Sequence, residues 1–120
     1  MSGKPPSGVD LAPDVDNWLR CAKETPWLES RFKKARKAIK ILREVGPSHP
    51  GFHTHPMDHL KGPDGVTIWN SYVENAAPNA WRMYWIWAPE GRIYVVSLGP
   101  HSHTPGVQPE VSRKGRMKNR

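Results

Sequence analysis

The chain has 120 residues, which is enough for one domain and too few for two separate cores. Its single cysteine excludes an internal disulfide, and no segment resembles a signal peptide or a membrane span, so a cytoplasmic protein is expected. Lysine and arginine outnumber acids by 18 to 11, and the net charge of +7 favours nucleic acid as a partner over a membrane surface, with an acidic protein as the alternative.

Proline and glycine mark both ends of the chain. Residues 1–13 are expected to be a flexible arm and residues 104–120 a loose basic tail, so the folded unit spans residues 14–103. The first element is a short helix over residues 14–23, for which Asp14 is the candidate cap.

A second helix follows and is the clearest element of the chain. Thr25 and Pro26 suit its start, Gly46 and Pro47 suit its end, and apolar residues recur between them at helical spacing. Its other face is strongly basic, and the candidate RNA-binding residues are Arg31, Lys33, Lys34, Lys37 and Lys40, together with Lys61 further along.

The second half of the chain reads as a loop and then a meander of strands. Residues 46–64 are expected to form a long loop, with a weak strand near 51–55. Strands are expected over 66–73, 80–87 and 92–98, the last two joined by a turn at 88–91. This order predicts an α+β fold in which two N-terminal helices pack on one face of a small antiparallel sheet.

The strand over 80–87 has two different faces. Its tryptophans alternate with polar positions, so Trp81 and Trp85 should pack on the helices. Arg82 and Tyr84 point the other way, and that face should be the more open one because a strand arginine needs water or an anion.

Six histidines flank these strands. Four lie in the expected loop and two follow the last strand: His49, His53, His55, His59, His101 and His103. RNA carries its own nucleophile, the 2′-hydroxyl, so cleavage needs a base, an acid and a cation for the charge that builds on phosphorus. Histidine suits both proton transfers at neutral pH, and arginine binds phosphate through two donors. We therefore expect a phosphodiester-cleaving site around Arg82, with Tyr84 or Trp69 stacking on a base.

Two other readings of the histidines remain open. The pairs His53/His55 and His101/His103 could bind zinc, although no second cysteine supports such a site. Alternatively, individual histidines are polar loop residues beside prolines.

The segments Ala80-Trp-Arg-Met-Tyr-Trp85 and Arg92-Ile-Tyr-Val-Val-Ser-Leu-Gly-Pro-His101, after two helices, resemble the RelE/ParE toxin superfamily. Phe52-His-Thr-His-Pro56 and Leu60-Lys-Gly-Pro63 resemble the corresponding part of RelE-like proteins. The resemblance implies a toxin–antitoxin module whose toxin cuts mRNA, usually on the ribosome, without metal or other cofactor, and is neutralised by a cognate antitoxin.

By motif position, the resemblance implies that Arg82 contacts the scissile phosphate and that His101, or else His103, is the terminal acid–base residue. His53, His55 and His59 would supply an additional base. Two alternatives without catalysis are a ParE-like gyrase inhibitor and a nucleic-acid-binding module.

Overall fold

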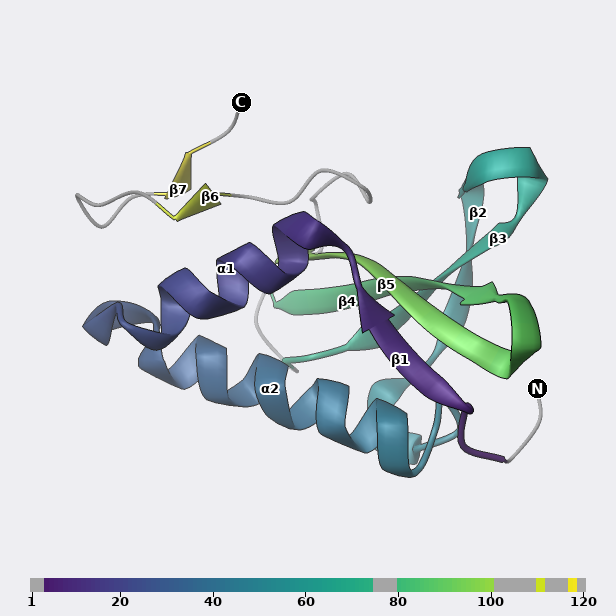
Figure 1. Cartoon of the computed structure of the whole chain (residues 1–120), viewed down its shortest axis with the longest axis horizontal. Helices are drawn as coiled ribbons and strands as arrows, with labels where there is room; N and C mark the ends of the chain where they lie inside the picture. The colour runs from purple at the N-terminus through teal and green to yellow at the C-terminus, as the bar shows by residue number, and fades with distance from the viewer. Residues whose placement is uncertain (1–3, 75–79, 101–109, 112–116, 119–120) are drawn as a thin grey trace.

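The structure, a computed structural model, describes residues 4–74, 80–100, 110–111 and 117–118. Within them the chain is an α+β protein with two helices and a five-stranded mixed sheet (Figure 1). The main elements in chain order are β1 (Gly8–Leu11), α1 (Pro13–Lys23), α2 (Glu29–Glu44), β2 (His55–Lys61), β3 (Thr67–Tyr72), β4 (Trp81–Ala88) and β5 (Arg92–Pro100). No helix among the described residues has the length and apolar content to cross a membrane.

The sheet is mixed because its first strand comes from the N-terminal arm. The strand order is β1-β5-β4-β3-β2, and β1 runs parallel to β5 while the other neighbours are antiparallel. Arg92 donates to the Asp10 carboxylate across this pair at 2.8 and 2.9 Å. The expectation of a purely antiparallel sheet is therefore wrong, and residues 8–11 of the expected flexible arm form a paired strand.

Both helices begin at positions other than those expected. Pro13 is the first residue of α1 and Ala12 its cap, while Asp14 lies inside the first turn, where a carboxylate favours the helix dipole. A short 3₁₀ turn over Pro26–Leu28 precedes α2. Thr25 occupies the cap position of this turn, as expected, but its side chain makes no capping hydrogen bond because its hydroxyl donates to the Cys21 carbonyl at 2.6 Å.

The segment expected to be one long loop contains an edge strand. β2 covers His55–Lys61 and pairs with β3 through His55↔Asn70 and Lys61↔Thr67, so it lies beyond the weak strand expected over 51–55. The pairing register shifts between Pro56 and Lys61. Proline and the shifted register are typical of edge strands, which need no donor on their outer side.

The C-terminal residues that the structure describes form a separate small ribbon. β6 (Glu110–Val111) pairs antiparallel with β7 (Met117–Lys118) inside the segment expected to be a loose tail.

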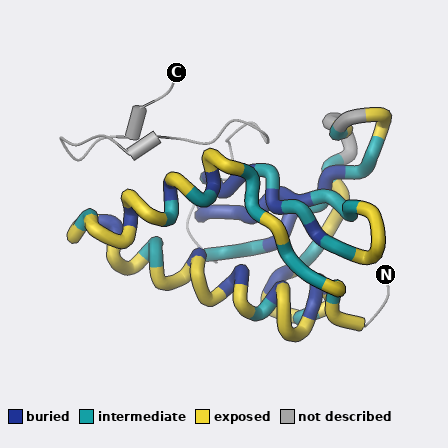
Figure 2. The backbone as a smooth tube through the Cα atoms, in the orientation of Figure 1, coloured by how far each residue is buried: buried dark blue, intermediate teal, exposed yellow. Residues whose placement is uncertain are grey.

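One core cluster contains side chains from both helices and from the sheet. Its buried side chains come from α1, α2, Phe52 and alternating positions of β4 and β5 (Figure 2). Trp18 of α1 contacts Trp81 of β4 with ring centroids 4.9 Å apart. Trp85 is fully buried and donates its indole N–H to Ser71 at 2.9 Å, which satisfies its polar atom inside the core. Alternation along β4 therefore places Arg82 and Tyr84 on the other face of the sheet.

Candidate nucleic-acid interface

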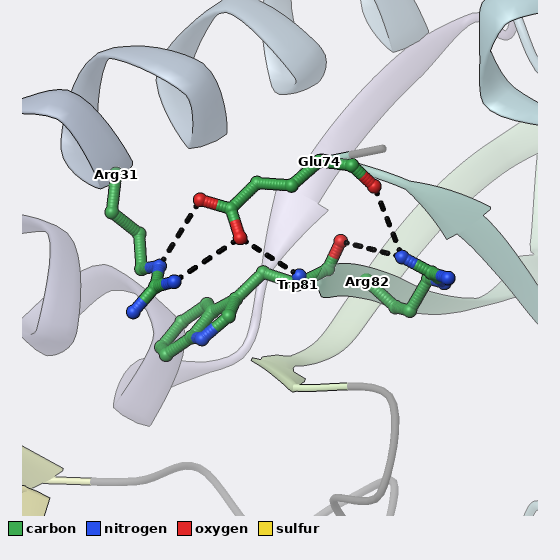
Figure 3. A network of polar contacts seen from close by, with 4 residues as sticks. All are labelled: Arg31, Glu74, Trp81 and Arg82. Atoms are coloured by element: carbon green, nitrogen blue, oxygen red, sulfur yellow. Dashed lines mark hydrogen bonds and ion pairs between the residues drawn. The ribbon is translucent and has the colours of Figure 1, made fainter. Parts of the chain in front are cut away.

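Arg82 is a buried cation on the face of the sheet opposite the tryptophans. Only 7% of its surface is exposed. Its Nη1 donates to the Glu74 carbonyl at 3.0 Å and to the Trp81 carbonyl at 3.4 Å (Figure 3). Its Nε is buried and has no hydrogen-bond partner among the described residues. The expected open face is therefore wrong for this side chain, because backbone carbonyls and an aromatic ring take the place of water.

That aromatic ring belongs to Tyr72, the register partner of Arg82 on β3. The Arg82 guanidinium carbon lies 3.7 Å from the centre of the Tyr72 ring. The same ring contacts the imidazoles of His53 and His55, with centroids 5.0 and 6.4 Å away. Tyr72 thus brings two of the expected catalytic histidines together with the expected phosphate-binding arginine, although sequence reasoning did not select it.

The ring of His55 is oriented by the backbone. Its Nδ1 lies 2.8 Å from the His53 carbonyl oxygen. A carbonyl can only accept, so Nδ1 carries the hydrogen, and in the neutral ring Nε2 then carries the lone pair. His53 has a φ of 45°, a left-handed conformation that is uncommon for a non-glycine residue. The tight turn presents one exposed imidazole with a defined acceptor nitrogen.

Glu74 connects this arrangement to α2. Its carboxylate accepts two hydrogen bonds from Arg31, each 3.2 Å long, and one from the Trp81 amide at 3.0 Å (Figure 3). Burial acts to raise the pKa of Glu74, but the hydrogen bonds from Arg31 and Trp81 and the charges of Arg31 and Lys34 outweigh it, so the pKa is lowered. The carboxylate stays ionised and holds Arg31 over the Trp81 ring, 4.9 Å from its centre.

A cleft of about 450 Å³ lies between α2 and the end of β3. Lys34 and Lys37 border it on the helix side, and His49 and Phe52 on the loop side. Tyr72 lines it on the sheet side, so the cleft leads from the basic helix to the ring that stacks on Arg82. Arg82, His53 and His55 contact Tyr72 without lining the cleft themselves, and we call the whole set the Tyr72 cleft.

The other expected RNA-binding bases lie in different settings. Arg31 is occupied by Glu74, and Lys33 forms an exposed ion pair with Glu29 at 2.9 Å. Lys40 is exposed on α2 but lines a separate groove. Lys61 is exposed at the last position of β2, and His55 is at the first position, so Lys61 is not part of the Tyr72 cleft.

Tyr84 and Trp69 do not border the cleft. Tyr84 is fully buried, which raises the pKa of its hydroxyl although the Arg82 charge acts in the opposite direction. A fully buried ring cannot stack on an incoming base, so the half-buried Tyr72 replaces it as the candidate for stacking. Trp69 is stacked on Trp85, with centroids 5.8 Å apart.

Three expected catalytic histidines cannot be placed. His101 and His103 lie outside the described residues, and the side chain of His59 on β2 is likewise not described. The described part of β5 ends at Pro100, which pairs with Trp81, the residue before Arg82. Among side chains that the structure describes, no group of three or more histidine, cysteine, aspartate or glutamate residues could hold a metal ion.

The chain matches no known protein-family model, no curated protein and no solved structure. The function of the chain is therefore inferred from the Tyr72 cleft itself. Sequence reasoning named His49 without giving it a role in the site, and it missed Tyr72 and Glu74, which also lines the cleft. Tyr72 carries a signal in the sequence, since it ends an alternating strand, but its contact with Arg82 requires the register between β3 and β4.

Proposed function

We propose that this protein is a cytoplasmic RNA-cleaving toxin of the RelE type, a metal-independent endoribonuclease acting on mRNA that a cognate antitoxin would neutralise. The observation that carries the proposal is the contact of Tyr72 with both the Arg82 guanidinium and the imidazoles of His53 and His55. A nucleotide whose base contacts Tyr72 would have its phosphate near the Arg82 guanidinium, and lysines at the entrance would attract the backbone.

The chemistry follows from the groups in the Tyr72 cleft. Nε2 of His55 accepts the proton of the 2′-hydroxyl, and the 2′-oxygen attacks phosphorus. The bond to the 5′-oxygen breaks, and that oxygen takes a proton from an acid, the role that the family resemblance implies for His101. The products are a 2′,3′-cyclic phosphate and a free 5′-hydroxyl end.

Arg82 supplies the positive charge for this reaction. Its Nε–H has no partner among the described residues, although an unpaired buried donor costs about 1 to 3 kcal/mol. A phosphate oxygen reaching this donor would remove that cost, and the benefit grows as charge builds on the phosphate in the transition state. Because the guanidinium is already held by two carbonyls and Tyr72, the cation itself keeps its position, and only the side chains that cover its Nε have to move.

The test is cleavage of a short RNA by the purified chain, with and without chelator, using wild type, His55→Ala, Arg82→Ala and His101→Ala. We expect each substitution to lower the rate by roughly 100-fold or more. Lys61→Ala, outside the cleft, is the matched control and should retain the rate. A substrate with a single 2′-deoxy sugar at the cut site should resist wild type. Wild-type rates in all three variants would eliminate the proposal.

One observation favours a second candidate, a nucleic-acid-binding module without catalysis. Arg82 is 7% exposed, so a phosphate reaches its Nε only if neighbouring side chains move. A binding module would bind RNA with steep salt dependence and leave it intact. Mapping transcript 5′ ends after induction of wild type and His101→Ala separates the two candidates in cells.

A further inference from the structure

A second concave surface lies between the two helices. This groove has a volume of about 790 Å³ and is lined by residues of β1, α1 and α2. We call it the interhelical groove. Its floor is apolar and its rim is basic, so its chemistry differs from that of the cleft.

The floor consists of Leu11, Leu19, Phe32 and Ile39. Three of these side chains are only half-buried, and Ile39 is 8% exposed. Seven cationic side chains and no acidic one stand around them: Arg20, Lys23, Lys33, Arg36, Lys37, Lys40 and Arg43. Two of the seven, Arg20 and Lys33, already form exposed ion pairs with Asp16 and Glu29 outside the groove. An occupant must therefore offer an apolar stripe to the floor and negative charge on both sides of it.

We propose that the interhelical groove is a docking site for an acidic amphipathic helix of a partner protein. A third helix packs naturally into the groove between two helices, with apolar side chains at positions i, i+3, i+4 and i+7 as anchors. Glutamate or aspartate beside that stripe would pair with the rim. A nucleic acid backbone would satisfy the charges but leave the four apolar side chains in water.

The groove is joined to the proposed RNA site through one residue. Lys37 lines both the interhelical groove and the Tyr72 cleft. Lys34 borders only the cleft, whereas Arg36 and Lys40 border only the groove. An acidic helix in the groove would thus neutralise a charge that the cleft uses, and it should weaken RNA binding. This competition rests on the proposed function, whereas peptide binding does not.

The experiment measures binding of a synthetic peptide to the full chain by fluorescence anisotropy. The peptide has about 16 residues, ~24 Å as a helix, with leucine at helical spacing and glutamate between. A second peptide keeps the glutamates and replaces each leucine with serine. The protein variants are Arg36→Glu/Lys40→Glu in the groove and Lys34→Glu/Lys61→Glu outside it, which change the net charge equally.

We expect the leucine peptide to bind, and the groove variant to weaken it at least tenfold, while the charge-matched variant stays within about twofold. The serine peptide should bind at least tenfold more weakly to wild type. The docking site is overturned if the leucine peptide fails to bind, if both peptides bind alike, or if both variants lose affinity equally. If the groove variant weakens the binding of a single-stranded RNA more than the charge-matched variant does, the groove is instead a nucleic-acid-binding surface. Helical circular dichroism checks that each variant is folded.

Discussion

The two faces of β4 are about equally buried, yet they are built on different principles. On the helix side, Trp81, Met83 and Trp85 are 3%, 0% and 0% exposed, and they need little more than apolar neighbours. On the other side, Arg82 is 7% exposed and must satisfy a charge. Burial alone therefore does not distinguish a side chain that stabilises the fold from one that is positioned for a ligand.

Polar atoms make the contrast sharper. On the helix side, the Ser71 hydroxyl contacts both the Trp85 indole at 2.9 Å and the Thr54 hydroxyl at 2.8 Å. Across the sheet, Arg82 Nε and Asn70 Oδ1 are buried without partners among the described residues, and near the helices only Trp18 Nε1 shares that condition. Unpaired groups cost stability, so two of them on one face point to a surface shaped for a ligand.

The largest effect should come from the helix side. Trp85→Ala removes a fully buried ring and leaves the Ser71 hydroxyl with one partner fewer, so it should lower the free energy of unfolding by about 3 to 5 kcal/mol. Urea denaturation measures this value. Trp27→Ala is the control, since that ring is 57% exposed, and it should change stability by less than about 0.5 kcal/mol. Equal effects would mean that the helix-facing side is not the principal core.

Glu74→Gln tests whether the Glu74 carboxylate links Arg31 of α2 to Trp81 of β4. The variant keeps an acceptor for Arg31 and Trp81 but loses the charge, and unfolding free energy at pH 7 should fall by about 1 to 2 kcal/mol. The pKa of Glu74 is lowered in the folded protein, so its contribution is complete above the unfolded pKa and is lost as pH falls through the folded value.

The difference between wild type and Glu74→Gln should therefore shrink as pH falls below the usual value of about 4.5, as followed by urea denaturation at each pH. Glu44→Gln, at the exposed end of α2, removes the same charge outside this network and should change the free energy of unfolding at pH 7 by less than about 0.5 kcal/mol. A difference that is constant with pH would show that the carboxylate charge does not hold α2 to the sheet.

Arg82→Met should separate stability from activity. Methionine keeps apolar contact with Tyr72, and the Trp81 carbonyl retains two backbone donors at 3.0 Å. The Glu74 carbonyl loses its donor, so the free energy of unfolding should fall by about 1 to 2 kcal/mol. RNA cleavage should nevertheless fall by roughly 100-fold or more. Urea denaturation and the cleavage assay on the same preparation measure both. If the variant does not fold, Arg82 is needed for stability, as the tryptophans on the other face of β4 are.

These differences also explain which features the sequence predicts. The second helix, three meander strands and the 88–91 turn depend on local periodicity, and the structure contains them at nearly the expected positions. The pairing of β1 with β5 depends on residues more than 80 positions apart, such as Asp10 and Arg92, and no local pattern encodes it. β2 was missed because its proline and histidines resemble a loop.

The candidate site shows the same division. Arg82, His53 and His55 were selected by chemical type, and the fold brings them together. Tyr72 and Glu74 join them only through strand register and the hydrogen bond from the Trp81 amide to Glu74, which sequence patterns leave undetermined. The basic face of α2 looked uniform, but the structure divides it between the Tyr72 cleft and the interhelical groove.

The smallest expected effect comes from Lys34→Ala, which tests whether the Tyr72 cleft is the part of the basic face that binds RNA. Lys34→Ala removes one exposed cation from the entrance of the Tyr72 cleft and should weaken RNA binding about two- to fivefold, while lowering the salt dependence by about one phosphate contact. Lys61→Ala removes the same charge far from the cleft, and it should change neither quantity beyond the general effect of net charge. Titration of a single-stranded RNA at several salt concentrations resolves both. If both variants lose the same amount of RNA affinity, RNA binding depends on the overall charge, and the Tyr72 cleft is not the RNA site.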